Sequence, residues 1–507
     1  MRNTVILHRL RVSVFLLFPV LGILTGCGNP SGESDRAERG DLPNFVLIVS
    51  DDHGTGDMGA YGNQAISTPN LDYLASEGIR FNQAYCTSAS CSASRSVILS
   101  GLYNHANGQY GHQHHYHHFS AFDHVISLPV FLEELAGYQT ARIGKYHVAP
   151  GKVFRFMEVL QADSRNPVAM ADSCLDFIED HRDHPFFLYF CTSDPHRAGP
   201  VSDRPTAPNS FGNIEGSREG VKKVSFTPDE VEVPPYLPES ESCREELAQY
   251  YQSVARVDQG AGRLFEYLKQ AGVWDNTVVI YISDNGIAFA GAKTTVYQPG
   301  INLPCLVKNT NSKNRGEVSD AMINWADLAP TILDLAGILP GAQKMVRERY
   351  DSLSQRGDRT VNPELQGHSF SAVLENPQAE GWDETYASHT FHEITMYYPM
   401  RSVITRKYKL IWNIASELPY PHASDLWSSS TWQAALKSRD RMYGVRTVEA
   451  YTHRPEFELY DLENDPYESR NLARDPAYTG ELVTLKEKIR DFQEHTRDPW
   501  ILKWEYE

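Results

Sequence analysis

Acidic and amide side chains follow two apolar runs of this sequence, and together they could bind a metal ion. Asp51-Asp52 comes directly after the run 44–50, and Asp284-Asn285 follows a second run at 277–282. Carboxylate and amide oxygens are hard ligands that suit Ca²⁺ or Mg²⁺ better than zinc. Either pair alone is more typical of a helix cap or a turn. Two such pairs on neighbouring strand ends favour a metal site.

A candidate nucleophile and several basic residues accompany these acids. Cys91-Ser92-Ala93-Ser94-Arg95 places a Cys and an Arg one helical turn apart, so both would project from the same face of a helix N-terminus. A helix N-terminus favours a bound anion. Lys145 and His147 follow one expected strand, and Asp194-Pro195-His196 follows another. Taken singly, a Lys or His after a strand is more often a solvated loop residue, but the order and spacing relative to Cys91 favour a shared site.

The elements that would position these residues alternate short apolar strands with helices. We expect strands at 44–50, 139–143, 185–191 and 277–282, helices that begin after Thr68 and Ser127, and a further helix over 327–334. This alternation is typical of a parallel sheet covered by helices on both faces. Ligands of open α/β sheets bind at the carboxyl ends of the strands. Three such ends carry the acidic or His groups, which predicts one site at that edge of the sheet.

The pattern changes from about Trp382 onward. The stretch 402–414 alternates like one strand, 457–461 is another, and a helix is expected from about Gly480 to Thr496. Because 507 residues exceed what one core usually supports, we predict an α/β catalytic domain over 44–381 and a smaller α+β domain with an antiparallel sheet over 382–507. The segment 198–242, rich in Pro, Gly and charge, is expected to be a long surface loop.

Taken together, these motifs resemble the sulfatase family whose motif cysteine is converted after translation to formylglycine. The resemblance rests on Cys91–Gly101, with Asp51-Asp52, Gly144–Val148 and Ser283–Gly286. It implies an alkaline-phosphatase-like α/β fold, in which a large, mostly parallel sheet lies between helices. Ala93 stands where many members have Pro, which bears on the maturation enzyme. We expect a radical-type formylglycine-generating enzyme that tolerates Ala.

The resemblance also implies the cofactor and the roles of the motif residues. One Ca²⁺ per active site would be held by Asp51, Asp52, Asp284, Asn285 and the formylglycine at position 91, and would also bind a sulfate oxygen. The hydrated aldehyde would attack sulfur, and loss of a proton from its second hydroxyl would release sulfate. Implied catalytic residues are Cys91, Arg95, Lys145, His147, His196 and Lys293.

Within this set the resemblance distinguishes three tasks. Lys145 would bind sulfate and His147 would take the proton that ends the cycle, whereas His196 and Lys293 would face the leaving atom. Lys293 stands where the most similar members have Arg, which bears on contacts to the leaving group.

The segment His392–Val403 resembles members of the family that act on N-sulfated glucosamine. It implies hydrolysis of the N-sulfate from a glucosamine at the non-reducing end of heparan sulfate or heparin fragments. An O-sulfatase acting on another sulfated glycan would share the same core chemistry. A glycan-binding surface lipoprotein whose centre is never matured is a third alternative, which the intact motif residues disfavour.

Four residues are candidates for the sugar pocket: His118, His392, Glu393 and Arg401. Glu393 could accept hydrogen bonds from sugar hydroxyls, and Arg401 could pair with a carboxylate or sulfate. An ion pair between the two domains is nearly as good an interpretation of these charges. A His-rich tract (His112, His114, His115, His117 and His118) could hold a metal, but we favour a loop beside the pocket in which one or two histidines contact substrate anions.

The N-terminus has the pattern of an export signal. Arg2, Arg9 and Arg11 precede an apolar run too short to span a bilayer comfortably, and Leu24-Thr25-Gly26-Cys27 resembles a bacterial lipobox. We predict a signal peptide over 1–26, lipidation of Cys27 and a flexible tether over 27–43. The protein would be a membrane-anchored, extracytoplasmic bacterial lipoprotein in the periplasm or on the cell surface. An ordinary secretory signal with an incidental cysteine is the alternative.

Charge and cysteine content restrict the partners. The formal net charge of −18 argues against nucleic acid and against a long basic groove for a polyanion, which suits attack at a chain end. Besides Cys27 and Cys91, five cysteines remain without regular spacing, so we expect neither an essential disulfide nor a zinc site made of CxxC pairs. Cys191 and Cys305 are expected to be buried in strands. The oligomeric state stays open, a homodimer included.

Overall fold

The protein is described by a computed structural model that covers residues 42–197, 211–214, 216–310, 313–358 and 360–505. Residues 39–507 form one compact unit. The predicted signal sequence, Cys27 and all of the predicted tether before residue 42 lie outside the described residues, so they stay predictions. The domain boundary predicted at residue 382 also stays a prediction.

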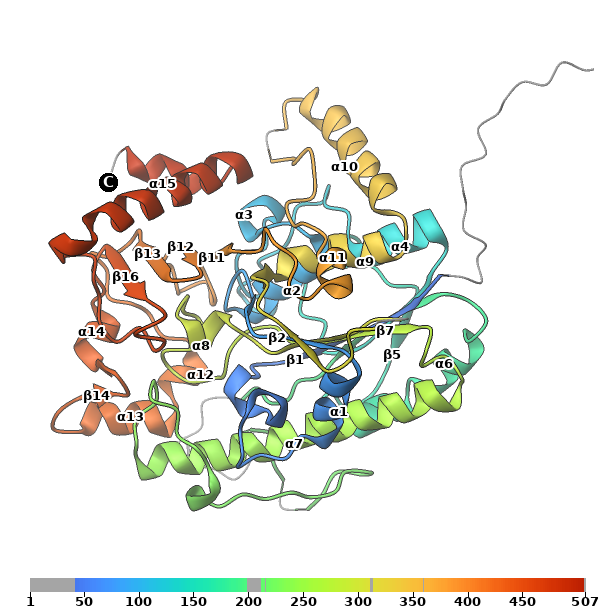
Figure 1. The fold of residues 1–507 in the computed structure, drawn as a ribbon, viewed down its shortest axis with the longest axis horizontal. Coiled ribbons are helices and arrows are strands. Elements are labelled where there is room, and N and C mark those ends of the chain that lie inside the picture. Colours follow the sequence, from blue (N-terminus) through green and yellow to red (C-terminus); the bar gives the residue numbers. More distant parts are fainter. Residues whose placement is uncertain (1–41, 198–210, 215, 311–312, 359, 506–507) are drawn as a thin grey trace, which may run out of the picture. The chain divides into compact units, whose positions relative to one another are not determined.

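A large sheet lies at the centre of this unit (Figure 1). In the sheet only β8 runs against the other strands, which are mutually parallel. The predicted mostly parallel sheet is therefore confirmed, as are its four expected strands. The strand order is β5 (Glu158–Leu160), β4 (Gln139–Gly144), β6 (Phe186–Cys191), β1 (Asn44–Ser50), β7 (Thr277–Ser283), β8 (Cys305–Lys308), β2 (Ile79–Phe81) and β9 (Glu317–Ser319).

The central strand β1 shows why the apolar runs lack polar alternation. Phe45, Leu47 and Val49 pack into one core cluster, and Val46 and Ile48 pack into another on the opposite face. A strand covered on both faces buries every side chain, as β1 does. In the register with its neighbours, Ser50 lies opposite Ser283 and Val49 lies opposite Cys191. The residues that follow these three strands therefore emerge side by side.

Helices cover both faces of the sheet (Figure 1). One face is covered by α1 (Pro69–Glu77), α5 (Pro167–Asp172), α6 (Leu175–Asp180) and α7 (Glu241–Gln270). The other is covered by α2 (Cys91–Ser100), α4 (Leu128–Ala136) and α9 (Leu328–Leu335). The helices predicted after Thr68, after Ser127 and over 327–334 are α1, α4 and α9.

The long helix α7 carries two glycines where other elements come close. A Cβ atom at Gly260 would lie 2.2 Å from Cβ of Pro167, and one at Gly262 would lie 2.3 Å from Oδ1 of Asn70. These glycines let α5 and α1 approach the backbone of α7. They also lower the local helix propensity, so packing rather than propensity explains the helix at these positions.

A smaller antiparallel sheet is formed by β11 (Glu384–His389), β12 (Met400–Thr405), β13 (Tyr408–Asn413) and β16 (Phe457–Asp461). Helix α15 (Thr479–Thr496) packs on it through Leu485 and Ile489, which share a core with Val403 and Leu410. The predicted antiparallel sheet and the C-terminal helix are confirmed.

The single strand predicted over 402–414 is wrong, because this stretch is a hairpin of β12 and β13. The chain reverses at Arg406-Lys407, and the hydroxyl of Thr405 bridges the turn. It donates to Tyr408 O at 2.9 Å and accepts from Tyr408 N at 3.0 Å. Both strands are almost entirely buried, and the turn at 405–408 contains no Gly, Pro, Asn or Asp to mark it, which is why the stretch resembled one strand.

Shorter elements connect these layers. The strands are β3 (Ala84–Tyr85), β10 (Ile323–Asn324), β14 (Met442–Tyr443) and β15 (Arg446–Thr447). The helices are α3 (Asn104–Asn107), α8 (Gln298–Ile301), α10 (Leu339–Ser354), α11 (Ser371–Glu375), α12 (Ser424–Trp427), α13 (Ser430–Lys437) and α14 (Val448–Thr452). Single 3-10 turns lie at Thr55–Asp57, Gly59–Tyr61, Pro228–Glu230, Trp325–Asp327, Pro476–Tyr478 and Pro499–Trp504.

The cysteines of the described residues are all buried and unpaired. Cys191 lies in β6 and Cys305 in β8, which confirms the burial predicted for both. Over the part of the chain that the structure describes, no helix has the length and apolar character needed to cross a bilayer.

Candidate active site

Four adjacent parallel strands bring the predicted chemistry to one edge of the sheet. In the order β4, β6, β1 and β7, each strand ends immediately before polar residues. Helix α2 begins at the same place, with Cys91 as its first residue. The residues delivered in this way are Lys145 and His147 after β4, Asp194 and His196 after β6, Asp51 and Asp52 after β1, and Asp284 and Asn285 after β7.

Three carboxylates and the thiol of Cys91 form the centre of this edge. One ligand atom each of Asp51, Asp52, Cys91 and Asp284 lies within 4.8 Å of all the others, and all four residues are buried. Asn285 joins them, because its Nδ2 donates to Asp52 Oδ1 at 2.5 Å. Asp52 adopts a left-handed backbone with φ of 68°, and its N–H donates to Asp284 Oδ1 at 3.2 Å. The structure thus brings together the residues predicted to bind a metal.

Three cationic side chains surround these carboxylates. Arg95 Nε donates to Asp284 Oδ2 at 2.8 Å, and Arg95 Nη1 donates to Lys145 O at 2.9 Å. The Lys145 ammonium pairs with Asp51. Lys293 is fully buried, and its Nζ lies 2.9 Å from Asp52 Oδ2. The predicted basic residues therefore contact the predicted metal ligands directly.

The charge balance at this edge still favours an added cation. Burial raises the pKa of Asp52 to about 7, against the opposing effect of Lys293. Burial also raises the pKa of Asp284 to about 6, against Arg95. For Asp51 burial acts in the same direction, but the permanent positive charges around it, Lys145 first and then Arg95, hold its pKa well below the ordinary value. A divalent cation would stabilise the ionised form of all three carboxylates.

Two oxygen atoms of the cluster are available to such a cation. Asp51 Oδ1 and Asn285 Oδ1 are buried and have no hydrogen-bond partner. Buried polar atoms without partners are rare and call for a ligand or water. The donor set consists of carboxylate and amide oxygens, which is the set that Ca²⁺ prefers. The residues present therefore fit a calcium ion.

Cys91 is poorly suited to react as a thiolate. Burial raises the pKa of its thiol well above the ordinary value, more strongly than Lys145 and Lys293 lower it. Its Sγ lies 3.9 Å from Asp52 Oδ1, and a thiolate there would face a carboxylate. Because the thiolate is the nucleophilic form of cysteine, an unmodified Cys91 would be weakly reactive in this position.

His196 faces the carboxylates with a defined tautomer. Its Nδ1 contacts the carbonyl oxygen of Arg197, which can only accept, so Nδ1 carries the hydrogen. Its Nε2 lies 3.8 Å from Asp52 Oδ2 and has a free lone pair when the ring is neutral. Burial, followed by the charge of Lys293, lowers the pKa of His196 to about 3. The ring is therefore neutral in the substrate-free protein.

Asp194, although part of the same motif, points away from this edge. It pairs with Arg165 at 2.9 Å and with Arg256 of α7 at 2.8 Å. The carboxylate therefore anchors the loop that presents His196, and in this motif only His196 reaches the cluster.

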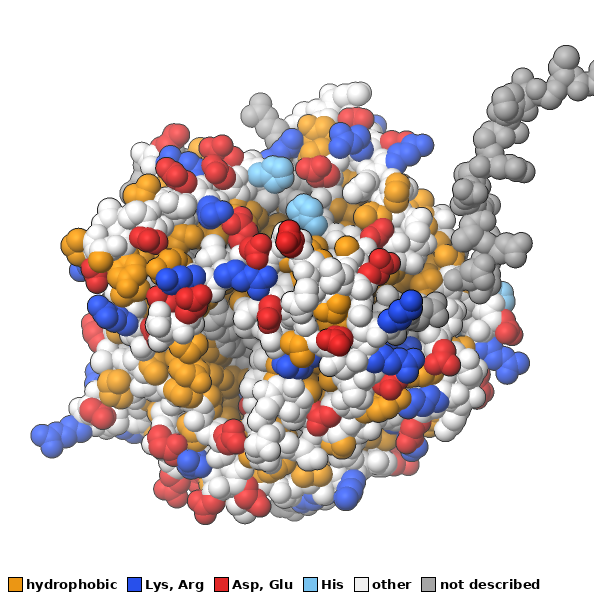
Figure 2. All heavy atoms as spheres, in the orientation of Figure 1, with side chains coloured by type: hydrophobic (Ala, Val, Ile, Leu, Met, Phe, Trp, Pro, Cys, Tyr) orange, Lys and Arg blue, Asp and Glu red, His pale blue; other side chains and the backbone are white. Residues whose placement is uncertain are grey.

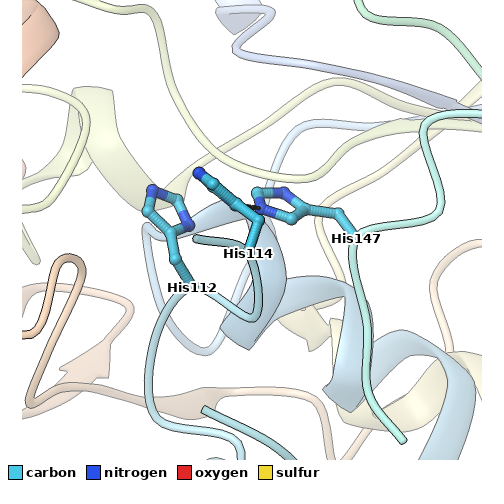
Figure 3. A group of neighbouring side chains, drawn as sticks. All are labelled: His112, His114 and His147. Carbon is cyan, nitrogen blue, oxygen red and sulfur yellow. Dashed lines mark hydrogen bonds between the residues drawn. The ribbon is translucent and has the colours of Figure 1, made fainter. Parts of the chain in front are cut away.

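His147 lies among histidines of the tract at 112–118. Its Nε2 is 2.6 Å from His114 Nδ1, and its ring stacks on that of His112 with centroids 4.9 Å apart (Figure 3). Burial, then the charge of Lys145, lowers the pKa of His147 well below its ordinary value. His147 is thus a neutral proton acceptor at pH 7.

Of the four sugar-pocket candidates, His392 contacts the residue next to Cys91. Its Nδ1 is 2.9 Å from Ser90 Oγ, and Ser90 is the residue that precedes Cys91. Glu393 accepts hydrogen bonds from the N–H of Ser424 at 2.9 Å and from its hydroxyl at 2.7 Å. It therefore fixes the start of α12 rather than touching the carboxylates.

The structure does not bring the other two candidates to the cluster. Arg401 is buried, and its guanidinium makes a bidentate pair with Asp498 and lies over the ring of Trp500. Both partners belong to the C-terminal region, so this is neither a free cation nor a pair between the two predicted domains. His118 is exposed, with a left-handed backbone (φ 53°).

Asp425 of α12 is a site residue that the sequence did not reveal. Its Oδ2 lies 3.0 Å from Lys293 Nζ and 3.9 Å from His196 Nε2. These contacts hold the two residues predicted to face the leaving atom. No local motif surrounds Asp425, and its partners are distant in sequence, so the only signal is its position in the folded chain.

Comparisons with known proteins are consistent with this geometry. Residues 43–338 match the protein family described as sulfatase. Human N-sulphoglucosamine sulphohydrolase is 37% identical, over 90% of this chain and 91% of that protein. N-acetylglucosamine-6-O-sulfatase of Bacteroides thetaiotaomicron is 25% identical, over 95% and 91% respectively. A solved structure in complex with its substrate D-glucosamine-2-N,6-O-disulfate has a TM-score of 0.62 at 22% identity, covering 90% of this chain and 99% of that one. This last similarity shows the shared fold.

Calcium binding should depend on Asp284. Asp284→Ala removes one carboxylate from the oxygen cluster and leaves Arg95 Nε without its partner, so we expect loss of stoichiometric calcium binding and of turnover. Calorimetric titration and metal analysis of the purified protein measure the binding.

Asp194→Ala is the matched control for this prediction. It removes an equally buried carboxylate that also follows a central strand but pairs only with arginines. It should lower stability and keep the calcium stoichiometry. Full calcium occupancy in Asp284→Ala would contradict the metal assignment.

Proposed function

Because this chain belongs to the sulfatase family, we propose that it is a hydrolase that removes the N-sulfate from glucosamine at the non-reducing end of heparan sulfate or heparin fragments. The observation that carries the choice of substrate is the 37% identity, over nearly the full length of both chains, to a human enzyme named for N-sulphoglucosamine. The relative named for a 6-O-sulfate is more distant, at 25% identity. A sulfamate and a sulfate ester are both monoanions, so the same charged centre could bind either.

Two groups would complete the proposed site. Conversion of Cys91 to formylglycine would supply a hydrated aldehyde as the nucleophile toward sulfur. Calcium held by Asp51, Asp52, Asp284, Asn285 and residue 91 would offset the charge of the bound sulfate. The high thiol pKa of unmodified Cys91 and the unpartnered oxygens of Asp51 and Asn285 support both groups.

Two lysines of the site, Lys145 and Lys293, would orient the sulfate. A Lys ammonium has three donors. Lys145 uses one on Asp51, and Lys293 uses two on Asp52 and Asp425. Each retains at least one donor for a sulfate oxygen. Arg95 would act by holding Asp284, and its unpartnered Nη2 is a further donor.

His196 and His147 would divide the proton transfers between them. Breaking the S–N bond requires a proton on nitrogen, and His196 presents Nε2 toward Lys293 and Asp425. The anionic substrate would raise the pKa of His196, because a nearby negative charge favours the imidazolium. His196 would therefore take up its proton together with the substrate and pass it to the leaving nitrogen. His147, kept neutral, would accept the proton released at residue 91.

The surface and the N-terminus complete the proposal. Figure 2 shows acidic and basic side chains interspersed over one face of the molecule, without a continuous basic stripe. Together with the net charge of −18, this favours a short fragment or a chain end over a long polyanion.

Lipidation of Cys27, anchoring to a bacterial membrane and maturation by a radical-type enzyme stay parts of the proposal.

Turnover should require a converted Cys91. Cys91→Ala should abolish turnover and leave the fold intact, because one small buried side chain replaces another. Cys86→Ala is the matched control, since Cys86 is equally buried but makes its nearest contact to the Gly300 carbonyl. It should remain active. Mass spectrometry of the peptide that contains residue 91 reports the thiol-to-aldehyde conversion, and full activity of an unconverted protein would refute the mechanism.

Substrate preference should separate N-sulfate from O-sulfate. Defined heparan disaccharides that differ only in N-, 2-O-, 3-O- or 6-O-sulfation are incubated with the converted enzyme, and free sulfate is quantified. We expect release from N-sulfated non-reducing ends and little from 6-O-sulfated N-acetyl analogues. The reverse preference would keep the sulfatase chemistry and overturn the proposed substrate.

The need for a proton at the leaving atom can be tested at His196. His196→Ala should slow N-desulfation by roughly 10²–10⁴-fold, the usual contribution of a positioned acid. An activated aryl sulfate, whose leaving phenolate needs no proton, serves as the control substrate and should be affected far less. Equal losses on both substrates would show that His196 positions the sulfate instead of donating a proton.

A further inference from the structure

Three histidines beside the catalytic centre form a compact group of nitrogen ligands. One ring nitrogen each of His112, His114 and His147 lies within 4.8 Å of the other two. The ring centroids of the three pairs are 4.6–4.9 Å apart. The group combines two residues of the His-rich tract with the residue proposed to accept the final proton. Its members come from two loops, the tract at 112–118 and the segment that follows β4.

The nitrogen atoms of this group face one another. Figure 3 shows a ring nitrogen of His112 directed toward His114 and His147, which are joined by a hydrogen bond. His112 Nδ1 is buried and has no hydrogen-bond partner, whereas His112 Nε2 lies 2.9 Å from His392 Nε2. The 2.6 Å contact between His114 Nδ1 and His147 Nε2 means that one proton lies between two lone pairs. A metal ion could take the place of that proton once the donating ring carries it on its other nitrogen, so that both facing nitrogens offer a lone pair.

The chemistry of the group suits zinc. Neutral imidazole is a good zinc ligand, and three histidines with an open fourth position form a well-known zinc geometry. Zinc–nitrogen bonds of about 2.0–2.1 Å place the ligand nitrogens of a tetrahedral site about 3.3 Å apart. The distance between His114 Nδ1 and His147 Nε2, now 2.6 Å, would therefore have to increase by less than about 1 Å. Burial, then neighbouring positive charges, keeps the pKa of His112 and His147 well below the ordinary value, so both rings are neutral ligands without losing a proton.

The surroundings of the group hold His112 in place. The His392 ring fixes His112 through the Nε2 contact, and the His392 carbonyl accepts from the His112 N–H at 2.9 Å. Metal-binding histidines are commonly oriented by such a contact to the second ring nitrogen. His114 is only half-buried, so the group can be reached from solvent.

We propose that His112, His114 and His147 form a zinc site, separate from the carboxylate cluster, and that zinc bound there inhibits the enzyme. Zinc on His147 would occupy the lone pair that accepts a proton, so catalysis would stop while calcium stays in place. The inhibition rests on the proposed function, whereas zinc binding does not.

Calorimetric titration with zinc tests the site directly. The full chain is first saturated with calcium, so that the oxygen ligands of the carboxylate cluster are occupied by the metal they prefer. The titration is repeated in Cys91→Ala, which removes the thiol as a competing ligand. We expect one zinc per chain in both proteins. Loss of an outer contact already costs 10–100-fold in metal affinity, so His112→Ala and His114→Ala should each weaken binding by at least about tenfold.

His118→Asn is the control from the same tract. His118 is exposed with a left-handed backbone, which Asn tolerates well, and its removal should leave zinc binding unchanged. Circular dichroism and thermal unfolding check that each variant is folded. His114→Ala is the decisive variant, because His114 is only half-buried and its truncation should disturb packing least.

Two results would overturn the site: no stoichiometric zinc binding to the calcium-loaded protein, or equal binding in the His112, His114 and His118 variants. The activity measurement is separate, with each enzyme compared with its own zinc-free rate. Turnover should fall as zinc occupancy rises and return when a zinc-selective chelator is added. Zinc binding without loss of turnover would overturn the inhibition and leave the proposed function standing.

Discussion

Three carboxylates buried within a few ångströms of one another are the constraint on which this structure depends. Asp51, Asp52 and Asp284 are fully buried, and isolated charges in such a place would be strongly unfavourable. Their neutralisation draws on three separate segments: α2 supplies Arg95, the loop after β4 supplies Lys145, and the loop after β7 supplies Lys293. These segments must dock correctly for the sheet to keep its acidic edge. Assembly of the fold and assembly of the charged centre are therefore coupled.

The same charges set the protonation state of the two neighbouring histidines, His196 and His147. Lys293 adds to the effect of burial on His196, and Lys145 does so on His147. Both imidazoles are therefore neutral before an anion arrives. The lysines thus serve two purposes, since they compensate the carboxylates and prepare the histidines as proton acceptors. Asp425 moderates this effect, because it shares Lys293 with Asp52 and lies near His196.

The central part of the site could be predicted from sequence because it follows a local rule. Each polar group after a buried parallel strand lies at the same edge of the sheet, so Asp51, His196 and Asp284 could be placed without coordinates. Residues whose role depends on distant contacts could not be placed. Asp425 is positioned by Glu393 through Ser424, and nothing in its own neighbourhood indicates a partner.

Other predictions failed or stayed incomplete for similar reasons. Arg401 was a pocket candidate because its guanidinium could pair with a carboxylate or sulfate, but its partner Asp498 lies 97 residues later in the chain. The hairpin at 400–413 turns at Arg406-Lys407 without a Gly, Pro, Asn or Asp, so nothing in the sequence marked the turn. In α7, Gly260 and Gly262 interrupt the helical propensity at the positions where α5 and α1 approach.

Two kinds of segment meet at the acidic edge of the sheet. The reactive groups follow strands of the large sheet, where a shift of one residue would disrupt the buried charges. His392 and Glu393 lie instead in the loop between β11 and β12, and Asp425 lies in the short helix α12. A substitution at Asp425 would therefore reach Lys293 and His196, whereas substitutions at the exposed loop positions Ile394, Thr395 and Tyr397 would leave the buried charges in place.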